Sequence, residues 1–252
     1  MADVEDILPD IPERVRDPKA GVSDLPVRFA SGVVMVALAA AALWLGGSIW
    51  AVFVLLIAAA AFWEMRRLVG AMKPSALKHV AWLAFGALYI AGAAIAMIDV
   101  RTDYGAWGVA MLYILPIIAV DVGAYFTGRA VGGPKIAPKL SPSKTWSGLA
   151  GGAIGASLVF IAVVLTGVFP DNMGVASEIA LALAVIAGVT VAVVAQAGDF
   201  FESWIKRRAG VKDSSNLIPG HGGVFDRVDG FLAVFFVLFC INTARSFSEG
   251  AF

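Results

Sequence analysis

Residues 29–63 read FASGVVMVALAAAALWLGGSIWAVFVLLIAAAAFW, and this stretch sets the fold class of the chain. A helix that spans a bilayer needs about 20 mostly apolar residues, so the stretch is long enough for two spans. The pair Gly46-Gly47 interrupts it near the middle, and glycine is the residue that most readily permits a turn. We therefore expect a hairpin of two membrane-spanning helices, over about 29–46 and 48–64.

Five further segments have the same apolar character: about 80–98, 106–127, 147–169, 178–198 and 226–244. Of the 252 residues, 60% are hydrophobic and 15% are charged, and the mean hydropathy is +0.84. A soluble domain usually contains about 45–50% apolar and about 25% charged residues. This composition excludes an ordinary soluble protein and a disordered chain. It predicts an all-α, polytopic membrane protein with about seven transmembrane helices.

Three glycines, Gly151, Gly152 and Gly155, lie close together in the fifth predicted span. Small residues let the backbones of two membrane helices approach closely. We expect a tight contact between two helices here, and local flexibility of the span is an equally good alternative.

Lysine and arginine are unevenly distributed between the segments that connect the predicted spans. Of the 19 Lys and Arg residues, only Arg101 and Arg245 lie on one side of the predicted topology. Cytoplasmic segments of membrane proteins carry an excess of these residues. The N-terminus and the loops 65–79, 128–146 and 205–225 are therefore expected in the cytoplasm, and seven spans would put the C-terminus outside.

Five acidic residues lie at or near the cytoplasmic ends of apolar segments: Asp121, Asp199, Glu202, Asp226 and Asp229. An ionisable side chain within a span is unfavourable by about 2.5–3.5 kcal/mol, so it should face the protein interior or a water-filled cavity. Helical spacing puts Asp199, Ser203 and Lys206 on one face, and it also puts Asp226 and Asp229 on one face. The two helices enter the membrane from the same side, so their acidic groups can meet.

Carboxylate, water and phosphate oxygens are the ligands that Mg²⁺ prefers. The spacing therefore predicts that Asp199 and Asp226 bind Mg²⁺. The alternative is that the acids form structural ion pairs with Arg207, Arg208 or Arg227, and we favour this alternative for Glu202.

Two long cytoplasmic loops have a composition that suits phosphate binding. Residues 128–146 read GRAVGGPKIAPKLSPSKTW, and residues 205–225 read IKRRAGVKDSSNLIPGHGGVF. Glycine lets backbone N–H groups approach a ligand, and lysine and arginine supply countercharge. Membrane orientation and attraction to anionic lipid headgroups are alternative reasons for some of the basic residues. A net charge of zero gives no bulk basic field for nucleic acid.

The second loop and its flanks carry a recognisable motif. The segments Ser203-Trp-Ile-Lys206-Arg207, Lys212-Asp213-Ser-Ser215 and Ile218-Pro219-Gly-His221-Gly222-Gly223-Val-Phe-Asp226-Arg227-Val-Asp229 resemble the signature of phosphatidate cytidylyltransferases over 27 consecutive positions. The upstream segment Asp121-Val-Gly-Ala-Tyr125-Phe-Thr-Gly128-Arg129, followed by Lys135, Pro138, Ser141-Pro-Ser-Lys144-Thr145 and Gly148, is similar to another block of that family. Together the resemblance covers about residues 121–230.

This resemblance implies an enzyme of phospholipid biosynthesis that converts CTP and phosphatidate into CDP-diacylglycerol and pyrophosphate. It also implies that the reaction requires Mg²⁺, and a second cation is compatible with such a site. The metal-binding aspartates of the family correspond to Asp199 and Asp226. As hypotheses, we assign catalytic roles to Asp199, Asp226, Lys144, Lys206, Lys212 and Arg227. We expect the substrate-binding residues to be Asp121, Ser141, Ser203, Asp213, His221, Gly222, Gly223 and Asp229.

The apolar pattern, the basic residues and the resemblance together suggest how the chain is organised and where it acts. We expect a polar cytoplasmic tail (1–27), N-terminal transmembrane helices (28–104) and a catalytic transmembrane domain (105–252). The bacterial inner membrane is the expected location, with the site facing the cytoplasm, and a homodimer is compatible with the family.

Two other functions stay open as alternatives. A related CTP-dependent lipid or polyprenol kinase would transfer only a phosphate to its lipid. The other alternative is an ion-coupled transporter, because acidic residues within a membrane often mark ion paths. Transporters commonly contain two related halves, and the two halves of this chain do not look alike.

Overall fold

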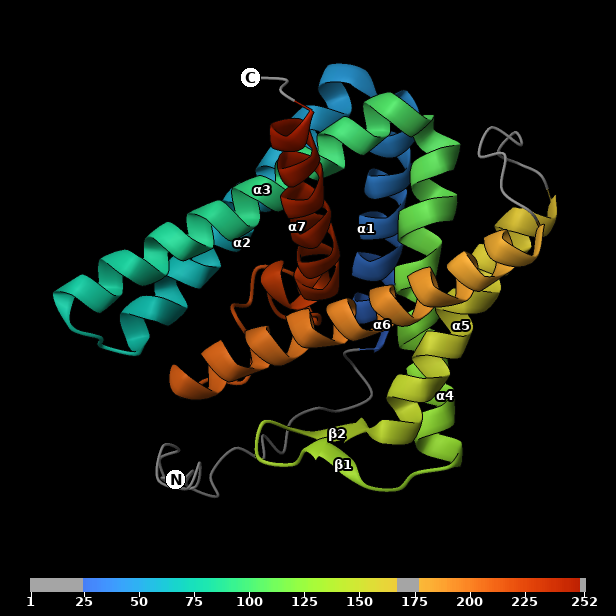
Figure 1. Cartoon of the computed structure of the whole chain (residues 1–252). Coiled ribbons are helices and arrows are strands. Elements are labelled where there is room, and N and C mark those ends of the chain that lie inside the picture. The colour runs from blue at the N-terminus through green and yellow to red at the C-terminus, as the bar shows by residue number, and fades with distance from the viewer. Residues whose placement is uncertain (1–24, 167–176, 250–252) are drawn as a thin grey trace.

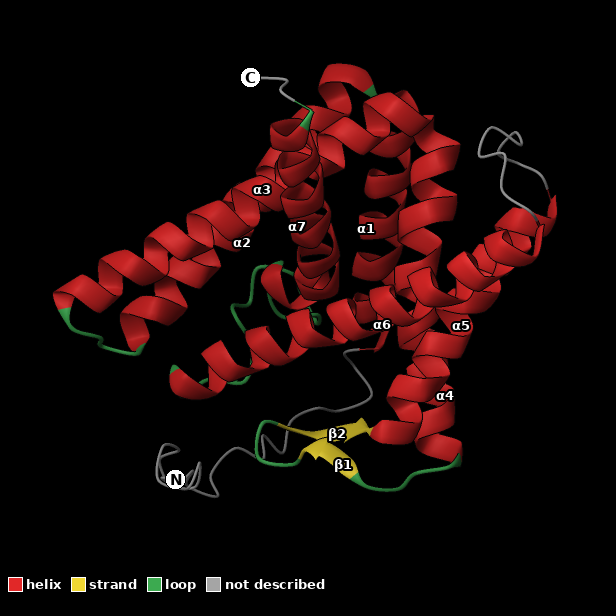
Figure 2. Cartoon of the chain, viewed as in Figure 1, coloured by secondary structure: helices red, strands yellow, loops and turns green. Residues whose placement is uncertain are grey.

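The computed structural model describes residues 25–166 and 177–249, which form a bundle of helices with one small β-hairpin (Figures 1 and 2). The predicted tail 1–27 lies almost entirely outside the described residues. In chain order the elements are α1 (Leu25–Leu45), α2 (Gly47–Ala71), α3 (Ala76–Val109), the π-helix η3 (Ala110–Ile114), α4 (Leu115–Ala130), β1 (Lys135–Ala137), β2 (Ser141–Thr145), α5 (Trp146–Thr166), α6 (Ser177–Arg208) and α7 (Phe225–Ser248).

Six helices in the described residues are long and apolar enough to cross a membrane, which confirms the all-α polytopic fold. The predicted turn between the first two spans is also confirmed, because α1 ends at Leu45 and α2 begins at Gly47. The third candidate runs from Ala76 to Ala130 and includes the predicted spans 80–98 and 106–127. Between them Gly105 has a φ of 67°, and the helix is kinked there; glycine adopts a positive φ readily. The count of seven crossings stays a prediction.

Several predicted boundaries are wrong. Helix α6 continues past residue 198 to Arg208, so Lys206, Arg207 and Arg208, which were expected in the loop, are helical. The 128–146 loop also contains regular structure, since β1 and β2 pair antiparallel with Lys135 opposite Thr145 and Ala137 opposite Ser141. Hydropathy marks where a chain is apolar enough for lipid, but it does not mark where a helix ends in water.

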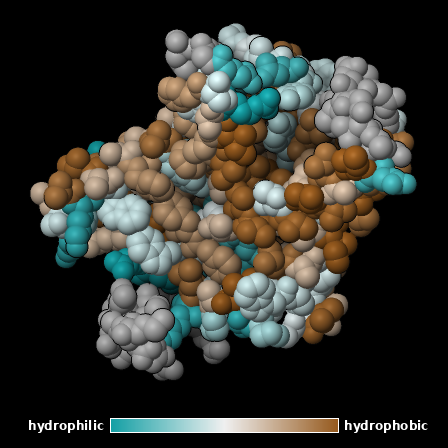
Figure 3. Space-filling view, viewed as in Figure 1, coloured by the Kyte–Doolittle hydropathy of each residue, from teal (hydrophilic) through white to brown (hydrophobic). Residues whose placement is uncertain are grey.

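The main buried core lies between α2, α3 and α7. Met65, Tyr89, Phe225 and Phe235 are all buried in it, and α6 adds Ile205. Outside this core many large apolar side chains are exposed over the helices, and hydrophobic residues dominate the middle of the face in Figure 3. Exposed apolar surface on this scale is typical of helices that face lipid.

Helices α4 and α5 pack with their backbones in contact. A Cβ atom at Gly152 would lie 2.9 Å from the carbonyl oxygen of Val120, and one at Gly155 would lie 2.6 Å from that of Ala119. Both distances are too short for any side chain other than hydrogen. The structure thus favours close packing over local flexibility as the reason for these glycines.

Contacts at the two ends of α1 show which loops lie on the same side of the bundle. At its C-terminal end Arg101 donates to the carbonyl oxygens of Leu43 (2.7 Å) and Trp44 (3.2 Å). Near its N-terminal end the hydroxyl of Ser31 lies 2.9 Å from Nδ1 of His221. The loop between α6 and α7 therefore lies at the opposite end from Arg101, as the predicted topology requires.

Candidate active site

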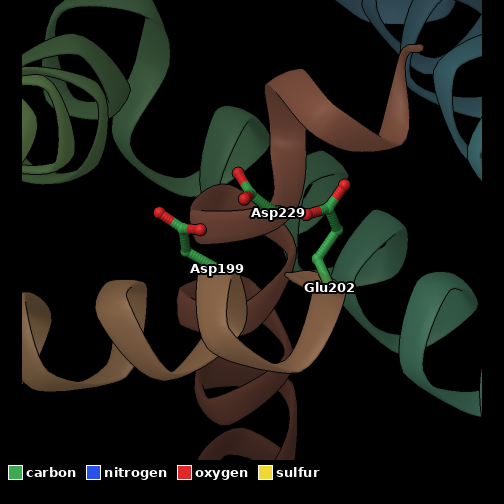
Figure 4. Close-up of side chains that lie close together, drawn as sticks. All are labelled: Asp199, Glu202 and Asp229. Atoms are coloured by element: carbon green, nitrogen blue, oxygen red, sulfur yellow. The ribbon is translucent and has the colours of Figure 1, made fainter. Parts of the chain in front are cut away.

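Three carboxylates converge where the C-terminal part of α6 meets the N-terminal part of α7. Asp199 and Glu202 project from α6 and Asp229 from α7 (Figure 4), and one oxygen of each lies within 4.8 Å of an oxygen of the other two. Only 1% of Glu202 is exposed, whereas Asp199 and Asp229 are half-buried. So many like charges stay ionised together only when cations are close by.

Two lysines supply part of that positive charge. Lys144, from β2, forms an ion pair with Asp199. Nζ of Lys206 lies 2.7 Å from Oε2 of Glu202 and 2.8 Å from Oδ1 of Asp226, so one ammonium group joins α6 to α7. Glu202 was expected to pair with an arginine, and this part of the prediction is wrong: its partner is Lys206, which the i, i+4 spacing places beside it.

Asp226 is held by the protein on both of its oxygens. Oδ2 accepts hydrogen bonds from the backbone N–H groups of Gly223 (2.8 Å) and Ser214 (3.0 Å), and the hydroxyl oxygen of Ser214 lies 3.0 Å from it. Oδ1 accepts from Lys206. The sequence predicts Asp199 and Asp226 as the metal ligands. The group whose geometry suits a metal ion consists instead of Asp199 with Glu202 and Asp229.

A pocket of about 310 Å³ opens beside these side chains. Nine charged residues line it, namely Asp121, Lys144, Asp199, Glu202, Lys206, Asp213, Asp226, Arg227 and Asp229. Six of these are acids and three are bases, so the pocket carries an excess of negative charge. The structure therefore brings most of the predicted catalytic and substrate-binding residues around one cavity, including the two predicted metal ligands.

Six predicted residues do not line this pocket: Ser141, Ser203, Lys212, His221, Gly222 and Gly223. His221 contacts Ser31 of α1, and its carbonyl oxygen accepts a hydrogen bond from Nε of Arg227 (3.0 Å). Gly222 has a φ of 81°, and a Cβ there would lie 2.9 Å from Oδ2 of Asp226. His221 and Gly222 thus shape the loop before α7, beside Arg227 and Asp226 of the pocket lining.

Two buried oxygen atoms beside the pocket have no hydrogen-bond partner among the described residues, Oε1 of Gln196 and Oε1 of Glu202. Gln196 lines the pocket and is 6% exposed. Leaving a buried acceptor unpaired is unfavourable by about 1–3 kcal/mol. The free oxygen of Glu202, beside two further carboxylates, fits a hard divalent cation such as Mg²⁺, whose preferred ligands are oxygens.

Sequence reasoning does not single out Glu64, Gln196 or Ser214. Glu64 is fully buried, and both of its oxygens accept hydrogen bonds from the loop before α7. The rule that ionisable residues within spans face the interior applies to Glu64 as it does to Asp199. That rule is the signal by which Glu64 could have been found.

The helices and the pocket define a polytopic α-helical membrane protein with an acidic cavity into which two lysines project. Residues 71–244 match the model of the cytidylyltransferase family. Since this segment is more than half of the chain, the chain belongs to the cytidylyltransferase family.

Curated relatives match part of the chain. The chain is 39% identical over 159 residues to the phosphatidate cytidylyltransferase of Brucella suis, which is 63% of this chain and 56% of the relative. It is 42% identical over 133 residues to that of Rickettsia bellii, covering 52% of this chain and 56% of the relative. For the enzyme of Haemophilus influenzae the identity is 46% over 125 residues, covering 49% and 42%. The chain thus spans about half the length of the curated relatives it matches.

Proposed function

We propose that the chain transfers the cytidylyl group of CTP to phosphatidate. An oxygen of the phosphatidate phosphate attacks the α-phosphorus of CTP, and the bond from that phosphorus to the oxygen that bridges to the β-phosphate breaks. The products are CDP-diacylglycerol and pyrophosphate. The observation that carries this proposal is the pocket in which Lys144 and Lys206 contact acids of α6 and α7, within the segment that matches the family.

The nucleophile needs little activation by the protein. A phosphate monoester has its second pKa at about 6, so it is largely dianionic near neutral pH. The work of the chain is therefore to align two polyanions and to neutralise their charge, as in other phosphoryl transfers.

Mg²⁺ fits the acid group at the pocket. Asp199, Glu202 and Asp229 would hold it, because their oxygens lie within 4.8 Å of one another and Glu202 has a buried oxygen without a partner among the described residues. When bound, Mg²⁺ would offset the negative charge of the CTP phosphates. Asp226 supports this group indirectly, since it orients Lys206 beside Glu202.

Lys144 and Lys206 supply positive charge for the phosphate groups of the substrates. Lysine carries a compact charge on a flexible stem, so Lys144 can exchange its contact with Asp199 for a phosphate oxygen of CTP. Lys206 is held by two carboxylates, and it keeps α6 and α7 together while its charge faces the pocket. Arg227 lines the same cavity and is suited to the phosphate of the lipid, because guanidinium groups bind phosphates with two hydrogen bonds.

We also propose that the pocket faces the cytoplasm of a bacterial cell. The matched relatives are bacterial, and the loops beside the pocket are the basic ones, which are retained in the cytoplasm. CTP is soluble and reaches this side from the cytoplasm, whereas phosphatidate presents its headgroup at the membrane surface.

The test uses the full chain purified in detergent, with CTP labelled in cytidine, phosphatidate and Mg²⁺. We expect label in the lipid fraction and release of pyrophosphate. The variant Asp199→Asn should lose this transfer, whereas Glu178→Gln, an exposed acid at the other end of α6, should retain it. No cytidine label in lipid from the unmodified chain would refute the proposal, and transfer of only the γ-phosphate would identify a lipid kinase instead.

A further inference from the structure

We propose that Glu64 of α2 is a positioning residue for the active site, because it fixes the loop before α7 and thereby the place of Asp226. This inference rests on the proposed function, since it assigns Glu64 a part in the same reaction. Glu64 does not line the pocket, so it acts through other residues.

The carboxylate of Glu64 accepts four hydrogen bonds, two on each oxygen. Oε1 accepts from the hydroxyl of Ser215 (2.5 Å) and the N–H of Val224 (3.0 Å). Oε2 accepts from the hydroxyl of Ser214 (3.0 Å) and the N–H of Phe225 (2.6 Å). All four donors belong to residues 214–225, which lie at least 150 positions away along the chain.

Glu64 accepts hydrogen bonds from backbone N–H groups at the start of α7. Val224 is the N-cap residue and Phe225 the first residue of that helix, and the first N–H groups of a helix have no partner within it. A negative charge is also stabilised at a helix N-terminus. Glu64 is 0% exposed and takes part in none of the ion pairs among the described residues, so these donors are what stabilises its charge.

A short chain of contacts leads from Glu64 to the acid group. The hydroxyl of Ser214 lies 3.0 Å from Glu64 and 3.0 Å from Asp226. Asp226 pairs with Lys206, which pairs with Glu202. Displacement of Glu64 would therefore be felt at Glu202, one member of the proposed metal site.

Gly223 shows how tightly this arrangement is built. A Cβ atom there would lie 1.9 Å from the hydroxyl oxygen of Ser214 and 2.6 Å from Oε1 of Glu64. Only glycine leaves room for the carboxylate against the loop. The close approach of Glu64 from α2 explains why the second residue of the Gly222-Gly223 pair is glycine.

Glu64 lies outside the segment that matches the family, which begins at residue 71. The inference therefore extends the active site to the N-terminal helical hairpin, which composition alone describes only as membrane spans.

The variant Glu64→Gln tests this inference with almost no change in size. Each oxygen of Glu64 accepts one backbone N–H, so the amide NH₂ group of glutamine must face one of these donors whichever way it is turned. The hydroxyl groups can reverse their hydrogen bonds, but a backbone N–H cannot. We expect faster hydrogen exchange at residues 214 and 223–225, and a kcat about 10–100-fold lower, the usual effect of removing a group that orients ligands. The Mg²⁺ concentration for half-maximal rate should rise.

The matched control is Met65→Leu, which changes an equally buried neighbour on α2 that packs on α3 at Gly86. Its kcat and loop exchange should stay at the values of the unmodified chain. If Glu64→Gln lowers only the unfolding temperature, with kcat and Mg²⁺ dependence unchanged, the inference is overturned and Glu64 is merely structural.

Two further measurements keep the inference testable. Should Glu64→Gln fail to fold, Ser215→Ala removes a single donor to Oε1 and should give a smaller change of the same kind; an unchanged kcat and unchanged Mg²⁺ dependence would overturn the inference. If the unmodified chain transfers no cytidylyl group, the proposed function fails. Hydrogen exchange then still decides whether Glu64 holds the loop, since unchanged exchange in Glu64→Gln would refute this part independently.

Discussion

Replacing Lys206 by methionine tests whether the bridge between α6 and α7 stabilises the fold. Methionine keeps a similar length and apolar stem but removes the charge. The side chains of Glu202 and Asp226, the two partners of Lys206, are only 2% and 6% exposed. Lys206→Met therefore leaves two buried carboxylates without their shared cation.

Breaking a buried ion pair by removing one partner is destabilising by about 3–5 kcal/mol, mostly because the remaining charge is left uncompensated. Asp226 retains hydrogen bonds from Gly223 and Ser214, whereas Glu202 loses Lys206, the cation with which it forms its ion pair. We expect a value near the lower end of that range. For a chain of this size, this corresponds to a fall in unfolding temperature of about 6–12 °C.

Thermal unfolding in detergent, followed by circular dichroism, measures this effect. The double variant Glu202→Gln/Lys206→Met should regain part of the lost stability, because it also removes the buried charge. Lys212→Met is the matched control, since Lys212 is exposed and a surface substitution usually changes stability by less than about 0.5 kcal/mol. If Lys206→Met and Lys212→Met unfold at the same temperature, the reasoning about the bridge is refuted.

Three further predictions concern single positions. Asp199→Asn should lower cytidylyl transfer at least about 100-fold while the unfolding temperature stays within a few degrees, because Asp199 is only half-buried; near-normal turnover would contradict its assignment to the metal. Gly155→Ala should destabilise the bundle by about 1–3 kcal/mol, because its Cβ would lie 2.6 Å from a backbone oxygen. The control is Gly70→Ala, where the Cβ meets no atom within 4 Å, and it should leave stability unchanged or raise it. An equal loss of stability in Gly155→Ala and Gly70→Ala would argue against the tight contact between α4 and α5. Gln196→Leu should preserve or raise the unfolding temperature, because it removes a buried unpaired oxygen, and should raise the KM for CTP or phosphatidate; an unchanged KM for both would show that no substrate uses Gln196.

Much of the fold follows from local patterns. Apolar stretches of sufficient length identify the helices, and the glycine pair at 46–47 correctly marks the first turn. The spacing of Asp226 and Asp229 correctly places both on the side of α7 that faces the pocket. Each of these inferences needs only the geometry of one helix or the water-to-lipid preference of its side chains.

The partners within the site depend on contacts between distant parts of the chain. Asp121 and Asp199 both line the pocket, and Lys144 forms its ion pair with Asp199. Helical periodicity cannot predict which of the two acids Lys144 contacts. Spacing and the family resemblance predict Asp226 as a metal ligand, but neither contains its hydrogen bonds from Gly223, Ser214 and Lys206. The contact between Glu64 and the loop before α7 joins segments 150 positions apart, and no local pattern contains that information.

The packing of α4 against α5 limits how a lipid can enter the site. Along this seam even a methyl group at Gly152 or Gly155 would strike a main-chain oxygen of α4, so acyl tails have no passage between the two helices. Val120 contacts Gly152 at this seam and also lines the pocket, so the close packing lies directly beside the cavity. On the proposed function, the lipid substrate enters along another side of the pocket, and a crosslinker placed on its acyl tails would label residues away from the α4–α5 seam.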